Sequence, residues 1–103
     1  MAITRDFADT IKARAERDPE FRKGLLDTAI ESLLSGEVDV GQAMLRDFIN
    51  ATIGFEALAQ KTDINAKSLH RMLGPRGNPT ARKLFPVLAR LREIEAAPPG
   101  AVP

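Results

Sequence analysis

Apolar residues recur at the spacing of an α-helix almost throughout this chain of 103 residues. They return after three or four residues, as they do on one face of a helix, and the strict alternation of a half-buried strand is missing. Runs of β-branched and aromatic residues, which mark strands, are lacking as well. The sequence therefore predicts an all-α fold of five or six short helices.

Composition limits the chemistry that the chain can perform. It is long enough for one hydrophobic core and too short for two. It has no cysteine and one histidine, which excludes thiolate chemistry and leaves few metal ligands, so we expect neither cofactor nor metal. Acids interrupt the first nine residues, and no apolar run approaches the roughly 20 residues of a membrane span. We therefore expect a cytoplasmic protein.

Capping signals divide the first half of the chain into three helices. Asp18 followed by Pro19 predicts the start of the second helix, because Asp accepts hydrogen bonds at an N-cap and proline suits the first helical position. Gly36 is placed to end that helix. Asp39 and Gln42 have the spacing of a capping box, which predicts the start of the third helix.

Residues 55–74 carry the most specific pattern in the chain. A helix-turn-helix needs two short helices that cross steeply, with a small residue at their contact and a turn residue that tolerates positive φ. Ala59 is the small residue, and Asp63 stands at the turn, where Asp is among the few non-glycine residues that tolerate the left-handed region. The apolar residues expected to face inward are Leu58, Ile64, Leu69, Met72 and Leu73.

The second helix of this motif is expected to present a basic and polar face. With Leu69 taken as the inward direction, an advance of 100° per residue places Lys67 and Arg71 nearly opposite it. Arg and Lys bind guanine and phosphate in the major groove, and Ser and His supply shorter donors and acceptors. We therefore predict a recognition helix, whose DNA-binding residues are Asn65, Lys67, Ser68, His70 and Arg71.

The loop of residues 74–80 follows the predicted recognition helix. Its glycines and prolines indicate a shaped turn. Asn78 or Thr80 is expected to cap the next helix, whose first amides suit a backbone phosphate. Arg76 is either a further phosphate contact or an ordinary residue of an interhelical loop. We include Arg76, Asn78 and Thr80 among the predicted DNA-binding residues.

The last helix is expected to be apolar on one face. Pro86 predicts a kink in it, or a continuous helix that begins only near Phe85. We divide the single domain into N-terminal helices at 1–52, a helix-turn-helix DNA-binding region at 53–95 and a frayed tail at 96–103. The N-terminal helices are expected to support the fold or to contact a dimer partner or toxin. The buried face of the last helix is expected to hold Leu84, Val87, Leu88, Leu91 and Ile94.

The net charge of +1 results from two regions of opposite charge. Residues 1–63 hold 8 Lys and Arg against 12 Asp and Glu, whereas residues 64–103 hold 7 against 2, so their net charges are −4 and +5. No acid lies between Asp63 and Glu93. A basic segment that coincides with the outward side of a candidate recognition helix is typical of a protein that binds nucleic acid.

The segment of residues 54–91 resembles the Xre/Cro-type helix-turn-helix, and more narrowly the antidote proteins of host-inhibition-of-growth addiction modules. The Leu-Ala pair at 58–59, residues 68–73 and above all the Gly-Asn-Pro-Thr run at 77–80 carry the resemblance. It implies a repressor that binds its own double-stranded DNA operator as a homodimer and, in the antidote case, neutralises a RelE-like ribonuclease toxin. Asp63 departs from the family, which has glycine at this turn.

Two other functions remain open. A stand-alone prophage-type repressor would use the same helix-turn-helix without a toxin partner. A helical protein-interaction module would turn the basic face toward an acidic partner instead of DNA. An enzyme is disfavoured, because His70 lies on an exposed helix face with no triad or ligand partner near it in the sequence.

A homodimer is expected on physical grounds. One recognition helix reads only a few base pairs, so adequate specificity takes two half-sites. The last helix, with Leu88, Leu91 and Ile94, is the first expected dimer surface. The amino-terminal helix is the second.

Overall fold

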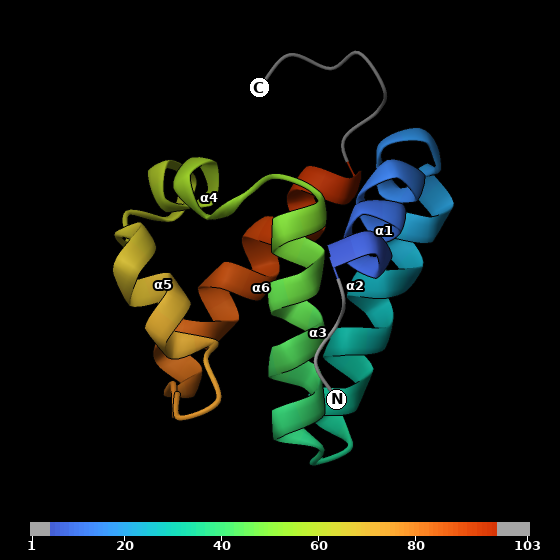
Figure 1. Ribbon diagram of the computed structural model, residues 1–103. Coiled ribbons are helices and arrows are strands. Elements are labelled where there is room, and N and C mark those ends of the chain that lie inside the picture. Colours follow the sequence, from blue (N-terminus) through green and yellow to red (C-terminus); the bar gives the residue numbers. More distant parts are fainter. Residues whose placement is uncertain (1–4, 97–103) are drawn as a thin grey trace.

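Six α-helices make up the part of the chain that the computed structural model describes, residues 5–96, with side chains described from residue 10 (Figure 1). In chain order they are α1 (Arg5–Arg17), α2 (Pro19–Leu34), α3 (Val38–Ala51), α4 (Phe55–Thr62), α5 (Ala66–Met72) and α6 (Ala81–Ala96). No strand occurs in these residues, so the predicted all-α fold is confirmed. Apart from Ala96, the predicted tail lies outside them.

The helices form two groups around α3. Figure 1 shows α1 and α2 on one side of α3 and the short helices α4 and α5 on the other, and α6 packs against both α2 and α4. None of the helices within residues 5–96 combines the length and apolar character that crossing a membrane requires.

Local capping sets both ends of α2. The side chain of Asp18 accepts a hydrogen bond from the backbone N–H of Phe21 at 3.1 Å. After the helix, Gly36 has a φ of +88°, which favours glycine, and its N–H donates to the carbonyl oxygen of Leu33 at 3.1 Å. The start and end predicted from the sequence are therefore confirmed.

The start of α3 differs from the prediction. The helix begins one residue before Asp39, with Glu37 at the N-cap position and no capping hydrogen bond from its side chain. The predicted capping box is wrong, because Gln42 is 3% exposed and lies in the core. Close packing of α2 on α3 explains this burial: a Cβ added at Gly41 would lie 2.6 Å from the Cγ of Leu33.

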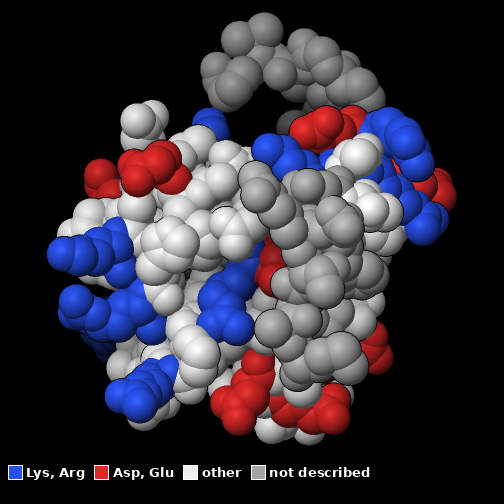
Figure 2. Space-filling view, in the orientation of Figure 1, with Lys and Arg blue, Asp and Glu red and all other residues white. Residues whose placement is uncertain are grey.

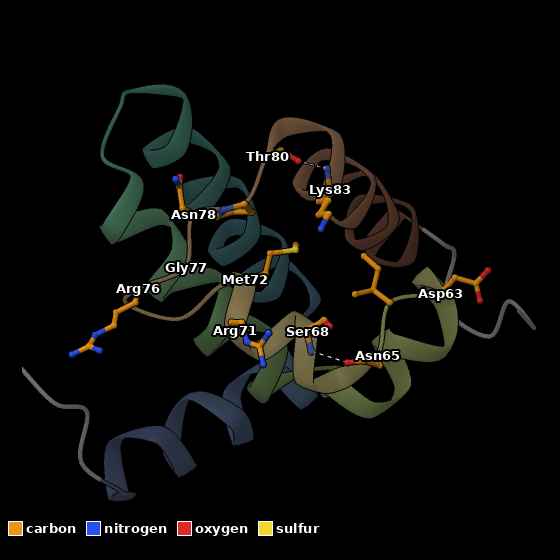
Figure 3. A pocket seen from close by; sticks show the side chains of 12 residues that line it. Asp63, Asn65, Ser68, Arg71, Met72, Arg76, Gly77, Asn78, Thr80 and Lys83 are labelled. Carbon is orange, nitrogen blue, oxygen red and sulfur yellow. Dashed lines mark hydrogen bonds between the residues drawn. The ribbon is translucent and has the colours of Figure 1, made fainter.

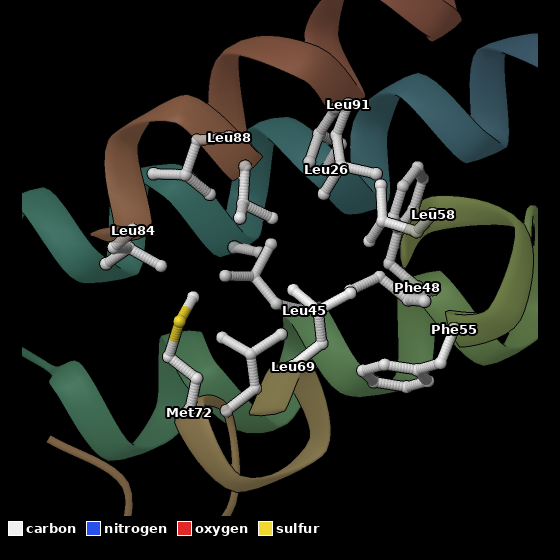
Figure 4. Close-up of a cluster of buried hydrophobic side chains, with 14 residues drawn as sticks. Leu26, Leu45, Phe48, Phe55, Leu58, Leu69, Met72, Leu84, Leu88 and Leu91 are labelled. Atoms are coloured by element: carbon white, nitrogen blue, oxygen red, sulfur yellow. The ribbon is translucent and has the colours of Figure 1, made fainter. Parts of the chain in front are cut away.

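One hydrophobic core joins the two halves of the sequence (Figure 4). The inward residues predicted for the helix-turn-helix contribute to it, and those predicted for α6 are buried apart from the half-buried Ile94. The helix-turn-helix is therefore held by the same core as α2 and α3. The buried members are Leu26, Ala29, Leu45, Phe48, Ile49, Phe55, Leu58, Leu69, Met72, Leu73, Leu84, Val87, Leu88 and Leu91.

Arg22 links three helices around this core. Its Nε donates to Glu95 Oε1 at 3.1 Å, which joins α2 to the end of α6, and its Nη1 donates to the carbonyl oxygen of Ala15 on α1. Both side chains of the ion pair are largely shielded from solvent. These contacts fix the far end of α6 against α1 and α2.

Pro86 lies inside α6 without ending it. The helix begins at Ala81, so the alternative of a start near Phe85 is wrong. Proline removes the hydrogen bond to the carbonyl of Arg82. Arg82, Phe85 and Pro86 are all exposed, so water can satisfy that carbonyl.

Asp47 on α3 gives the fold a pH dependence. Burial raises the pKa of its carboxyl above the ordinary value of 3.8, and Arg46 partly opposes this rise. Because the folded protein holds this proton more tightly than the unfolded chain does, the free energy of unfolding falls as the pH rises from the unfolded-state pKa through the folded-state pKa. We therefore expect Asp47→Asn to raise the thermal midpoint at pH 7, and the gain to vanish below about pH 3.8. Thermal melts at both pH values check this, and an unchanged midpoint at pH 7 would contradict it.

Candidate nucleic-acid interface

A sharp turn places α5 across the end of α4. Asp63 ends α4 with φ 59° and ψ 21°, as predicted, and no other non-glycine residue in the described part of the chain has positive φ. This left-handed conformation costs most residues roughly 1–2 kcal/mol, whereas Asp visits it more readily. Asp63 therefore supplies the left-handed turn residue that the predicted helix-turn-helix needs.

The side chain of Asn65 caps the first turn of α5. The side-chain oxygen of Asn65 accepts a hydrogen bond from the backbone N–H of Ser68 at 2.8 Å (Figure 3). The side-chain NH2 of Asn65 is therefore left as a donor toward a ligand. Leu69 and Met72 anchor the inner face of this short helix in the core.

A hollow of about 570 Å³ lies between α5 and the start of α6 (Figure 3). It brings together six of the eight predicted DNA-binding residues. Their side chains are amides, hydroxyls and two guanidinium groups, which between them can donate and accept hydrogen bonds. These six residues are Asn65, Ser68, Arg71, Arg76, Asn78 and Thr80.

Lys83 also lines this hollow and was missed from the sequence. Thr80 caps α6, since its Oγ1 accepts a hydrogen bond from the backbone N–H of Lys83 at 3.3 Å. The cap and the residue three positions later lie together at the helix start. Its three-residue spacing from the predicted cap at Thr80 is the sequence signal that could have identified Lys83.

Lys67 and His70 do not line the hollow. Both are exposed on α5. His70 stacks on Phe55 of α4, with the ring centroids 3.8 Å apart and the planes inclined by 20°. This contact places the imidazole on the flank of α5 that faces α4, so the structure separates His70 from the other predicted residues.

The loop after α5 lies tightly against the end of that helix. The N–H of Gly77 donates to the carbonyl oxygen of Gly74 at 2.8 Å, which turns the chain back. A Cβ added at Gly77 would overlap the carbonyl oxygen of Met72. Only glycine allows this close approach, which sets the position of Arg76, whose side chain extends away from the others in Figure 3.

The charge around the hollow is predominantly positive. Figure 2 shows basic side chains on the side of the molecule where α5 lies, and acidic ones at the end where α2 meets α3. The hollow is lined by three cations and one acid, Asp63, whose carboxylate points away from them in Figure 3. Among the described residues, no group of three or more His, Asp or Glu could hold a metal ion. The arrangement suits an extended polyanion.

No family model, curated protein or solved structure matches this chain. Its function is therefore inferred from the geometry and charge of the residues that form the hollow. Three cations line it together with amide and hydroxyl groups beside a capped helix.

Proposed function

We propose that this chain is a sequence-specific repressor that binds double-stranded DNA with α5 as its recognition helix. The supporting observation is the hollow on the flank of α5, where Arg71, Arg76 and Lys83 meet neutral hydrogen-bonding side chains. Cations neutralise phosphates and position the protein, whereas amide, hydroxyl and guanidinium groups read base edges. A protein-interaction surface would not need this combination of groups along α5, the loop that follows it and the start of α6.

The geometry suggests separate roles for the two sides of the hollow. Ser68 and Arg71 lie on one side, in adjacent turns of α5, and suit base edges in the major groove. Arg76 in the loop after α5, and Thr80 and Lys83 at the start of α6, suit the phosphates that flank the groove. We propose that the protein binds as a homodimer, so that two α5 helices read half-sites ~34–36 Å apart.

Titration of the full chain with duplex DNA tests this proposal. The probe is the DNA upstream of its own coding sequence, and the control is a scrambled duplex of equal length. Two cationic phosphate contacts per protomer, from Arg76 and Lys83, predict that log K falls with log salt with a slope of about −2 for each half-site. We expect tighter binding to the upstream duplex. Equal affinity for both duplexes, or none for either, would contradict sequence-specific binding.

Asp63 is the acid on the rim of the hollow, and its removal should strengthen DNA binding. Asn also tolerates the left-handed region, so Asp63→Asn removes the charge and retains the turn. We expect about two- to fivefold tighter binding at low salt, with a smaller gain as salt screens the charge. Asp27→Asn, at an exposed site on α2, is the control. Weaker binding by Asp63→Asn than by this control would contradict the proposed interface.

The acidic end of the molecule supports a second role as the antitoxin of a toxin–antitoxin module that autoregulates its operon. It lies apart from the basic face (Figure 2), so a basic RelE-like toxin could bind there while DNA occupies α5. The resemblance to addiction-module antidotes implies the same partner. The test is a small basic protein encoded beside this gene: co-expression should restore growth that the neighbour alone inhibits. Failure to rescue growth would count against the antidote role.

A further inference from the structure

A second hollow, of about 280 Å³, lies on another face of the molecule. It runs between the α2–α3 turn and the start of α6, with Leu84 and Leu88 among its lining residues. Three of the four large hydrophobic residues exposed within the described part of the chain line it. They are Leu34, Val38 and Phe85, which are 79%, 47% and 58% exposed. We call this surface the apolar groove.

Gln42 is a buried polar residue beside the apolar groove. Its side chain is 3% exposed and lines the groove, and its Nε2 has no hydrogen-bond partner among the described residues. A buried donor without an acceptor destabilises the fold. A rotation of the Gln42 side chain would let a carbonyl oxygen of a chain docked in the groove accept this hydrogen bond.

Exposed charges of opposite sign stand three residues before two of the exposed apolar residues of the groove. Glu31 precedes Leu34 by three residues on α2, and Arg82 precedes Phe85 by three residues on α6, so each charge neighbours one exposed apolar residue. Glu31 and Arg82 are both exposed. A twofold axis along the groove places Glu31 of one copy opposite Arg82 of the other. The surface is therefore complementary to itself, as a twofold interface requires.

We infer that the apolar groove is the surface through which a second copy of this chain binds. This inference deepens the homodimer of the proposed function and rests on it. Asn78 and Pro79 line both the groove and the DNA-facing hollow, so the dimer axis would lie beside the DNA interface.

The groove replaces the dimer surface expected from the sequence. Leu91 is 1% exposed and belongs to the core, whereas Leu88, which is 9% exposed, lies at the bottom of the groove. Phe85, on the same helix, is exposed instead. The amino-terminal helix is left as the competing surface.

Sedimentation of the full chain without DNA tests the inference. Wild type should sediment as a dimer at micromolar concentration, and Phe85→Glu should raise the dimer dissociation constant at least about 30-fold, because it places a charge at the centre of the contact. Ala13→Glu introduces the same charge at an exposed site on α1 and should leave the dimer intact. A monomeric wild type, a dimeric Phe85→Glu or a monomeric Ala13→Glu would each overturn the inference. Should Phe85→Glu fail to fold by circular dichroism, Leu34→Glu replaces it with the same expected result.

A charge exchange tests the twofold arrangement itself. Arg82→Glu alone should weaken the dimer by placing two acids opposite each other. Adding Glu31→Arg to it restores opposite charges in both copies and should recover the dimer. If the double variant is as weak as the single one, the axis proposed here is wrong. A chain that dimerises through the groove but binds no duplex would contradict the proposed DNA binding and leave this interface standing.

Discussion

A single methyl group added at Gly77 is expected to destabilise the protein and to weaken its binding to DNA. The new Cβ would overlap the backbone carbonyl oxygen of Met72, and a backbone atom cannot move aside as a flexible side chain can. Overpacking of this kind costs typically 1–3 kcal/mol. Because the loop carries Arg76 and Asn78, its displacement should also lower the affinity for duplex DNA at least about tenfold.

The same substitution at Gly24 is the matched control and should have the opposite effect on stability. Gly24 is exposed within α2, and a Cβ added there meets nothing within 4 Å. Replacing glycine by alanine inside an exposed helix stabilises by about 0.8–1 kcal/mol. Urea denaturation of the two variants should therefore give shifts of opposite sign. A Gly77→Ala variant as stable as wild type, with unchanged DNA affinity, would contradict the role given to this loop.

Features set by neighbouring residues were predictable from the sequence. The start of α2 needs only Asp18 and Pro19, and the turn before α5 needs only a residue that accepts positive φ, which Asp63 provides. The buried faces of α5 and α6 follow from the spacing of leucines that face one core. In each case the residues that form the sequence pattern lie within one or two helical turns of the structure that they determine.

Features set by helix crossings were not predictable. Nothing near His70 in the sequence indicates that it stacks on Phe55, because the contact depends on the angle between α4 and α5. The capping box at Gln42 failed because α2 packs closely on α3 and draws that side chain into the core. The exposure of Phe85 likewise depends on where α6 meets the α2–α3 turn.

Reversing two charges of the DNA-facing hollow is expected to abolish most DNA binding. Arg71 on α5 and Lys83 on α6 line opposite sides of the hollow and come from different helices. Each lost contact to a base or phosphate costs about 1–3 kcal/mol, and reversal adds repulsion from the phosphates. We therefore expect Arg71→Glu with Lys83→Glu to weaken binding to duplex DNA at least about 100-fold. Both residues are exposed, so the fold should persist.

Comparison of this double variant with Lys23→Glu plus Arg92→Glu is the most direct test of the DNA interface. Lys23 and Arg92 are exposed on α2 and α6 and do not line the hollow. Both double variants change the net charge equally, so long-range attraction to DNA falls equally in each. At 150 mM salt, where charges are screened beyond about 8 Å, the control should stay within about threefold of wild type. A loss of about 100-fold confined to Arg71→Glu with Lys83→Glu is the predicted result. Equal loss in both variants, or no loss in either, would contradict DNA binding through α5.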